Sequence, residues 1–307
     1  MRYKGLDLNL LAALEVLLSE RNVTRAAGRL NLTQSATSSA LARLREQFGD
    51  DLLIPAGRDL RRSALAEEIL PKVRAILAQV DNNLLRDRNI DPRVVRRDVR
   101  IMASDYVALT VLGPGLAKIA SEAPGLHFEI VPVTDAVALA IENYSIDLLI
   151  APDVYVSSRH PSAFFFYDDY VALACIKNTR LSGVLAKDEY LSTPQVSVRF
   201  QLAGALPHDE KSLEQDGNFK MITITVRSHA LMPYFVMETS RIATLQRRQG
   251  EIFARQFPLK ILELSEEIAI PPIREMFQWH ESNNGDPVLD YVCNTLRTIA
   301  QDAVHDK

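Results

Sequence analysis

Near the start of the chain, apolar positions recur every three or four residues, the period of an amphipathic α-helix. This spacing predicts three short helices. Asn22 or Thr24 caps the second and Thr33 the third, because such side chains accept hydrogen bonds from the free amides of a first helical turn. Gly49 ends the third helix. The leucines of the first helix are Leu6, Leu10, Leu14, Leu17 and Leu18. The inward face of the third helix is expected to carry Ala36, Ala40, Leu41 and Leu44.

A small two-stranded wing and a long helix are predicted next. Leu52–Ile54, a turn at Pro55–Gly57 and Leu60 form the wing. From Ala64 to about Arg88 a single apolar stripe keeps helical spacing, and a long helix of this kind outside a core needs a partner helix. Pro71 either kinks this helix or marks a fresh helical start. The stripe consists of Leu65, Ile69, Val73, Ile76, Leu77, Val80 and Leu84.

Beyond Asp91-Pro92 strands alternate with helices, which is typical of α/β packing on a mostly parallel sheet. The expected strands are 99–103, 127–133, 146–151, 195–199, 221–226 and 268–279. The expected helices are 106–121, 136–144 and 287–300. The whole chain then divides into a head (1–63), a linker helix (64–90) and a two-lobed domain (91–307). Lobe I takes about 95–172 and 268–304, and lobe II about 173–267.

Charge is distributed unevenly along the chain. Residues 1–62 hold ten Lys/Arg and seven Asp/Glu, a balance of +3, and the whole chain carries −4, so the rest carries −7. A mildly basic head on an acidic body suits a protein that contacts a polyanion with one end. Cys175 and Cys293 lack metal-ligand spacing, so we expect buried thiols and neither a metal nor a cofactor. No signal peptide or membrane-spanning stretch is evident, and a cytoplasmic location is expected.

The outward face of the third helix suits DNA. Short polar residues at its N-terminal end let a helix enter the major groove, where Gln pairs with adenine, Ser with several bases, and Arg with guanine or phosphate. From these residues alone, a helical hairpin with a solvated polar face remains the alternative. The outward residues are Gln34, Ser35, Ser38, Ala42 and Arg45, and the wing adds Arg58, Arg61 and Arg62.

Residues 6–63 resemble the head of the LysR-type transcriptional regulators, and the similarity continues through the linker and the two-lobed domain. The family's Ser-Gln-Pro/Ser-Ala-x-Ser reads Thr-Gln-Ser-Ala-Thr-Ser at 33–38. Residues 6–11, 24–27, 32–36 and 41–44 carry the rest of the match. The segments 1–11, 157–161, 276–280 and 284–287 are similar to the NodD/NahR-like branch, which senses flavonoids, salicylate and chlorinated phenols.

The resemblance implies a winged helix-turn-helix, a long linker helix and a two-lobed, periplasmic-binding-protein-like α/β effector domain. It implies a regulator that activates a promoter in response to a small phenolic, flavonoid or aromatic-acid effector. The implied partners are double-stranded promoter DNA, RNA polymerase and further copies of the chain in a homodimer or homotetramer. Leu53 and Pro55 stand where many relatives carry Phe and Arg, so the wing contact is expected from Arg58. The DNA-contacting set is Thr33, Gln34, Ser35, Ser38, Arg43, Arg45 and Arg58.

Two-lobed α/β folds bind ligands in the crevice at the carboxyl ends of their strands. Ser104 and Thr134 are expected to donate hydrogen bonds there, Arg199 or His229 to meet a carboxylate or phenolate, and Phe200 to stack on a ring. Asp105 is either a contact or only a helix cap, since its charge repels an anionic effector. For each, an ordinary cap or turn is the alternative. Core or structural packing is favoured for Tyr155, Phe164–Phe166, Tyr167, Tyr170, Trp279 and His280.

Two other classes of protein, an enzyme and a solute-binding protein, fit the sequence less well. An enzyme on the same fold would need catalytic groups that converge from dispersed positions, because the chain has no GxSxG, Walker, GxGxxG or HExxH pattern. A solute-binding protein would need a secretion signal and would have no use for the head. We therefore expect a regulator and not an enzyme.

Overall fold

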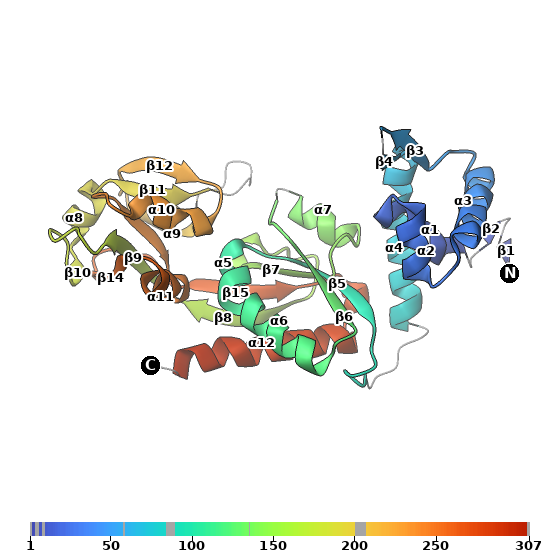
Figure 1. Cartoon of the computed structure of the whole chain (residues 1–307). Coiled ribbons are helices and arrows are strands. Elements are labelled where there is room, and N and C mark those ends of the chain that lie inside the picture. Colours follow the sequence, from blue (N-terminus) through green and yellow to red (C-terminus); the bar gives the residue numbers. More distant parts are fainter. Residues whose placement is uncertain are drawn as a thin grey trace. The chain divides into compact units, whose positions relative to one another are not determined.

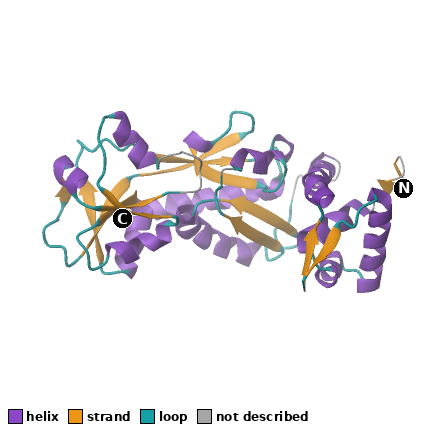
Figure 2. Ribbon diagram, turned by 90° about the horizontal axis from the view of Figure 1, so that it is seen from above, coloured by secondary structure: helices purple, strands orange, loops and turns teal. Residues whose placement is uncertain are grey.

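The computed structural model describes residues 2–3, 6–7, 10–57, 59–83, 90–134, 136–199 and 207–305. The chain divides into two compact units, the first formed mainly by Met1–Arg88 and the second by Asn89–Ile141 and Ile146–Lys307 (Figures 1 and 2). Within the described residues, no helix combines the length and apolarity that crossing a membrane requires.

The first unit is a helical head with a two-stranded wing. Its elements are β1 (Arg2–Tyr3), β2 (Leu6–Asp7), α1 (Leu10–Glu20), α2 (Val23–Leu30), α3 (Gln34–Phe48), β3 (Leu53–Ala56), β4 (Asp59–Arg62) and α4 (Ala64–Asn83). The strands β3 and β4 pair antiparallel as the wing. The fully buried side chains Leu14, Leu17, Leu18, Leu44 and Leu53 form the centre of the core.

The helix ends follow the expected capping chemistry. Asn22, not Thr24, caps α2 by accepting a hydrogen bond from the Arg25 amide at 3.0 Å. Thr33 caps α3 and accepts from the Ala36 amide at 3.2 Å. Gly49 follows α3 with φ +60°, a left-handed conformation that glycine adopts without strain.

The inward face of α3 differs from the expectation at one position. Ala36 is exposed and Thr37 is fully buried instead. The Thr37 hydroxyl donates to the Thr33 carbonyl at 3.0 Å, which satisfies it inside the core. The prediction was wrong here because a threonine reads as polar, whereas its methyl group packs as an apolar one.

The linker helix α4 runs without a break through Pro71. The predicted stripe divides between two faces. Val73 is buried in the core of the head beside Ala66 and Leu70, which lie outside the stripe, and Ile69 and Leu77 pack against that core, whereas 46% of Ile76 is exposed. Leu84 lies outside the described residues. Part of the apolar surface that seemed to need a partner helix is therefore covered by the head itself.

Lobe I of the second unit is built on a five-stranded sheet in the order β6-β5-β7-β15-β8. Its strands are β5 (Arg97–Met102), β6 (Leu126–Val131), β7 (Leu148–Pro152), β8 (Ser162–Asp168) and β15 (Ile273–Gln278). The pairs β5–β6 and β5–β7 are parallel, but β15 runs antiparallel to both β7 and β8. The sheet is thus mixed, because the returning segment inserts between two strands of the outgoing one. Its core is shared with α6 (Gly113–Glu122) and α12 (Pro287–His305).

Lobe II contains a six-stranded sheet in the order β10-β14-β9-β13-β11-β12. Its strands are β9 (Tyr170–Cys175), β10 (Val184–Leu185), β11 (Gln195–Val198), β12 (Ile222–Val226), β13 (Ile242–Gln246) and β14 (Leu259–Leu264). Its helices are α8 (Lys187–Ser192), α9 (His208–Gln215), α10 (Met232–Val236) and α11 (Arg247–Gln256). Both cysteines are buried and free, as expected.

The two crossings between the lobes fix the hinge. The chain leaves lobe I after Asp168 and enters lobe II at Tyr170, slightly earlier than the expected 172–173. It returns at Ile273, later than expected, because Ile268 still packs in the core of lobe II. The remaining helical segments are α5 (Asp105–Val107), a π-helical turn (Ala108–Leu112), α7 (Val137–Glu142) and short 3-10 turns at Asp153–Tyr155, His229–Leu231 and Glu281–Asn283.

Candidate nucleic-acid interface and interlobe ligand site

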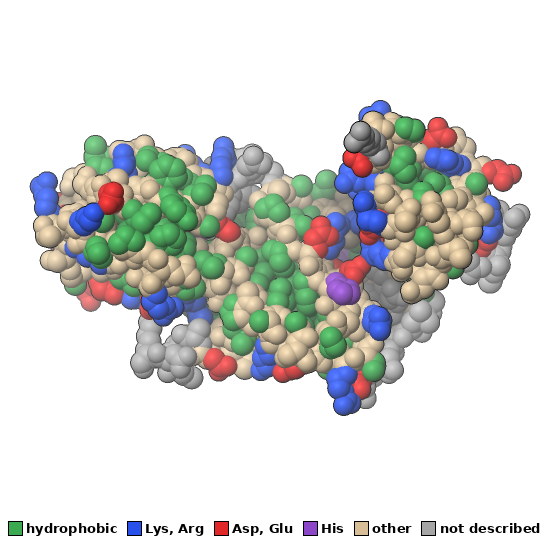
Figure 3. Space-filling model, viewed as in Figure 1, with side chains coloured by type: hydrophobic (Ala, Val, Ile, Leu, Met, Phe, Trp, Pro, Cys, Tyr) green, Lys and Arg blue, Asp and Glu red, His purple; other side chains and the backbone are tan. Residues whose placement is uncertain are grey.

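The N-terminal half of α3 presents a polar face to solvent. Gln34, Ser35 and Ser38 are all exposed, and the hydroxyl oxygens of Thr33 and Ser35 lie 3.0 Å apart. Figure 3, in the view of Figure 1, shows this part of the head as mostly uncharged, with Lys and Arg side chains scattered around it. Short uncharged donors and acceptors on a convex helix suit the edges of base pairs in a major groove.

The two arginines of α3 have different surroundings. Arg43 is half exposed and pairs with Asp7 of β2. Arg45 donates from Nε to the Asp51 carbonyl at 2.7 Å and from a terminal nitrogen to the Leu53 carbonyl at 2.8 Å. Arg45 therefore fixes the start of the wing to α3, a role that its sequence position did not reveal. Arg58 lies outside the described residues.

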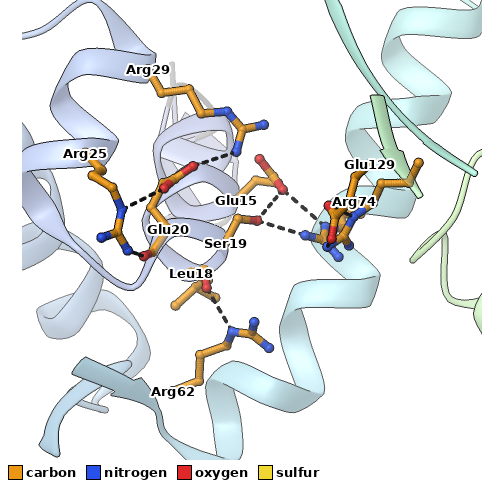
Figure 4. Close-up of polar contacts among 10 residues, drawn as sticks. Glu15, Leu18, Ser19, Glu20, Arg25, Arg29, Arg62, Arg74 and Glu129 are labelled. Carbon is orange, nitrogen blue, oxygen red and sulfur yellow. Dashed lines mark hydrogen bonds and ion pairs between the residues drawn. The ribbon is translucent and has the colours of Figure 1, made fainter. Parts of the chain in front are cut away.

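A set of exposed and half-buried polar contacts holds the other elements of the head together (Figure 4). Arg62 of β4 donates to the Leu18 carbonyl at 2.8 Å, so its guanidinium points into the head and not outward as expected. Glu20 receives both Arg25 and Arg29, each at 3.2 Å. These contacts tie α1, α2 and the wing into one frame, which presents α3 in a fixed orientation.

A cavity of about 70 Å³ lies between the two lobes of the second unit. Most of its lining is apolar or aromatic. The apolar side chains are Val133, Ile150, Ala151, Pro152, Val198, Pro207, Leu245 and Ile273. The rings are Tyr106, Tyr155, Tyr170, His208 and His229, and the other polar residues are Ser104, Asp209, Thr244, Gln246 and Glu275. The His208 and Tyr170 rings stack with their centres 5.8 Å apart and an interplanar angle of 4°.

The structure brings some of the predicted effector residues together and separates others. Ser104 and His229 line the cavity, whereas Thr134 and Arg199 are not among its lining residues. Ser104 also caps α5 by accepting from the Val107 amide at 3.2 Å. Arg199 instead pairs with Glu210 at 2.8 Å beside a separate surface hollow. Phe200 lies outside the described residues.

Asp105 connects the two lobes. Its carboxylate, on α5 of lobe I, accepts hydrogen bonds from Ser228 Oγ at 2.5 Å, His229 Nδ1 at 2.9 Å and the Ala230 amide at 3.1 Å, all in lobe II. Burial raises its pKa, but the hydrogen bond and charge of His229, with the other two donors, hold the pKa well below its usual range. Asp105 is thus an interlobe clasp, and neither a cavity contact nor the cap of its own helix.

Sequence reasoning missed the polar side chains that face the cavity from within strands. Gln246 ends β13 and Glu275 lies in β15, with exposed fractions of 5% and 1%. Tyr155 and Tyr170, expected in packing, also line the cavity. A detectable signal was present, because Gln and Glu interrupt runs that otherwise read as buried strands, and a buried polar residue needs a partner.

The segments that carried the branch resemblance have structural partners. The Gln278 side chain accepts from the Ser157 amide at 3.0 Å and donates to the Ser157 and His160 carbonyls at 2.6 and 3.2 Å. Asp286 accepts from the first amides of α12 and pairs with Arg97 of β5 at 2.5 Å. These motifs therefore stabilise lobe I.

A winged helix-turn-helix head with an exposed polar helix, joined by a linker helix to a two-lobed α/β unit, defines a class of DNA-binding transcription regulators. The model of the "bacterial regulatory helix-turn-helix protein, lysR family" matches residues 8–67. Nodulation protein D 2 of Rhizobium tropici is 38% identical over 287 residues, which cover 94% of this chain and 90% of that protein. The chain therefore belongs to the LysR family of transcriptional regulators, as its motifs predicted, and is not an enzyme.

Solved structures show the same fold. A "probable transcriptional regulator", PA0477 of Pseudomonas aeruginosa, aligns with a TM-score of 0.78 and 24% identity over 95% of this chain and 97% of that one. The LysR family regulator CbnR aligns with a TM-score of 0.62 and 12% identity, covering 96% and 99% of the two chains. A structure of full-length CbnR with its target DNA aligns with a TM-score of 0.51 and 13% identity, covering 96% and 100%.

Proposed function

We propose that this LysR-type regulator activates a promoter when a small aromatic effector occupies the cavity between its lobes. Its domains are a DNA-binding head (1–63), a dimerising linker helix (64–90) and an effector domain (91–307). The observation that carries the DNA half is the exposed polar face of α3, where Gln34, Ser35 and Ser38 stand free of the core. The effector half rests on the cavity lining, in which aromatic rings from both lobes converge.

The contacts on DNA divide by chemistry. Gln34, Ser35 and Ser38 read base edges, and Thr33 lies at the helix N-terminus, where amides and the helix dipole favour a phosphate. Arg43 is exposed enough to exchange Asp7 for a phosphate. Arg45 acts indirectly, because both of its hydrogen bonds hold the wing. The contact expected from Arg58 remains part of the proposal.

Dimerisation follows from the face of α4 that the head leaves uncovered. Ile76 is half exposed, and a second α4 would cover it together with the half-buried Leu65 and Val80. Two copies then place their recognition helices in major grooves about one helical turn apart. Two such dimers form a tetramer through the effector domains, which recruits RNA polymerase.

The size of the cavity indicates how an effector acts. At about 70 Å³ it is roughly half of the ~150 Å³ cavity that admits a benzene ring. An aromatic effector must therefore part the lobes, and it favours an open arrangement over the closed one. The Asp105 clasp is one of the contacts that this opening breaks.

A footprint on the promoter beside the gene tests the DNA half. Gln34→Ala and Ser38→Ala should each weaken specific binding by about 1–3 kcal/mol, because each removes a base contact. Gln256→Ala is the matched control, since Gln256 is an exposed glutamine at the end of α11. Footprints unchanged in both α3 variants would refute the assignment of the reading face.

A further inference from the structure

Three polar atoms that face the interlobe cavity have no hydrogen-bond partner among the described residues. They are Gln246 Oε1, Glu275 Oε2 and His208 Nδ1. Leaving a buried polar atom unpaired costs about 1–3 kcal/mol, so three around one small cavity are not expected of simple packing. Polar atoms that stay unpaired within the protein indicate that a bound molecule forms hydrogen bonds with them.

The geometry of these residues narrows the choice of ligand group. Gln246 belongs to lobe II and Glu275 to lobe I, so a group lying between them contacts both lobes at once. The Gln246 side chain is also hydrogen-bonded to Tyr170, which fixes the orientation of its amide group. The remaining amide oxygen, Oε1, has no partner among the described residues and can only accept. The ligand group must therefore donate a hydrogen bond to Gln246.

The surroundings of Glu275 determine its protonation state, and therefore which hydrogen bond it forms with the ligand. Burial, reinforced by the neighbouring Asp168 and Asp153, raises the pKa of Glu275 to about 8. Near pH 7 this side chain is a neutral acid that donates as well as accepts. Asp168 itself lies beside Arg248, and Asp209, the other carboxyl group of the cavity lining, is paired with Lys220.

The lining offers no compensation to an anionic ligand. Among the described residues, the cavity is lined by no Lys or Arg side chain, and its carboxyl groups come from Asp209 and Glu275. Of the two lining imidazoles, His229 is already paired with Asp105, and burial lowers the pKa of His208. A carboxylate placed here therefore loses its water without gaining an uncommitted cation, which is strongly unfavourable. A hydroxyl group loses little free energy when it leaves water, because it both donates to an amide oxygen and accepts from a protonated carboxyl group.

We propose that the cavity selects an uncharged aromatic ligand with a free hydroxyl, which donates to Gln246 Oε1 and accepts from Glu275, and that it rejects aromatic carboxylates. This inference rests on the aromatic effector proposed above and chooses between the phenolic and the acidic members of that class. Gln246 and Glu275 are then the residues that determine specificity.

Three single-ring probes test the selection on the full-length protein. Methyl 3-hydroxybenzoate is neutral with a hydroxyl, 3-hydroxybenzoate is charged with the same hydroxyl, and methyl 3-methoxybenzoate is neutral without one. At about pH 7, calorimetric titration should show the first binding at least about tenfold more tightly than either of the others, the factor expected for one satisfied buried hydrogen bond. A carboxylate that binds as well as its ester would overturn the selection while leaving an aromatic effector in place.

Variants locate the effect in the cavity. Gln246→Leu should bring the hydroxyl probe down to the affinity of the methoxy probe, and the exposed control Gln256→Leu should not. If Gln246→Leu does not fold, Glu275→Gln replaces it, because this neutral side chain of the same size should keep the preference for the ester. A Glu275→Gln protein that prefers the carboxylate, or an unchanged Gln246→Leu protein, contradicts the assignment. Absence of binding by all three probes refutes the aromatic effector itself.

Discussion

The reading face of α3 and the interlobe cavity are built in opposite ways. The reading face comes from consecutive residues of one helix, 33–38, and its orientation follows from a helical period and a cap. The cavity takes residues from positions as far apart as Ser104 and Glu275, on strands, turns and helix starts of two lobes. The reading face can therefore be recognised in a short stretch of sequence, whereas the cavity exists only after strand order and hinge position are fixed.

The largest expected effect is on the stability of the effector unit through Glu275. Its pKa is about 8 in the folded protein and near 4.5 when unfolded, so the folded state holds the proton more tightly. Stability is thus lost as pH rises from about 4.5 to 8, where the folded state must either keep a proton or bury a charge. Glu275→Gln removes this penalty and should raise the free energy of unfolding by on the order of 4 kcal/mol at pH 8, and by little near pH 4.

Denaturant melts at several pH values check this prediction. The groups that act on Glu275 are Asp168, itself beside Arg248, and Asp153. Burial raises the pKa of Asp168 to about 6, and its titration broadens the curve but does not reverse its sign. The exposed Glu214→Gln serves as the control and should show no pH-dependent gain. A stability gain in Glu275→Gln that is equal at every pH would mean that the pKa of the carboxyl group is the same in the folded and unfolded states.

The contrast also explains what the sequence revealed. Helix caps at Asn22, Thr33 and Gly49, and the family itself, were predictable because each depends on neighbours within a turn or on a contiguous motif. The mixed sheet was not, because the direction of β15 depends on a chain return more than a hundred residues after β7. Nor was the failure of Arg199 to reach the cavity, because a nearby Glu210 captures it.

A second variant tests whether Arg45 supports the reading face or belongs to it. Arg45→Ala removes two charge-assisted hydrogen bonds to the Asp51 and Leu53 carbonyls, and should destabilise the wing by about 1.5–3 kcal/mol. Hydrogen–deuterium exchange should accelerate in β3 and β4. The exposed Arg61→Ala, on the same wing, is the control. A weaker footprint with unchanged exchange in β3 would instead make Arg45 a direct DNA contact.

The smallest expected effect concerns Asp105, and it joins the cavity to regulation. The clasp is partly exposed, so its charge is screened, and Asp105→Asn should weaken the closed arrangement of the lobes by only about 1 kcal/mol. That is about a fivefold change in population, enough to raise promoter activity without effector by a similar factor if opening is what an effector achieves.

A reporter assay with the exposed Asp290→Asn as control measures this promoter activity without effector. Because the pKa of Asp105 lies well below its usual range, its carboxylate stays ionised and keeps its three hydrogen bonds until the pH falls below that range. Basal activity that is the same in Asp105→Asn and in the wild type would separate the clasp from the regulatory transition, and opening would then have to depend on the polar atoms of the cavity alone.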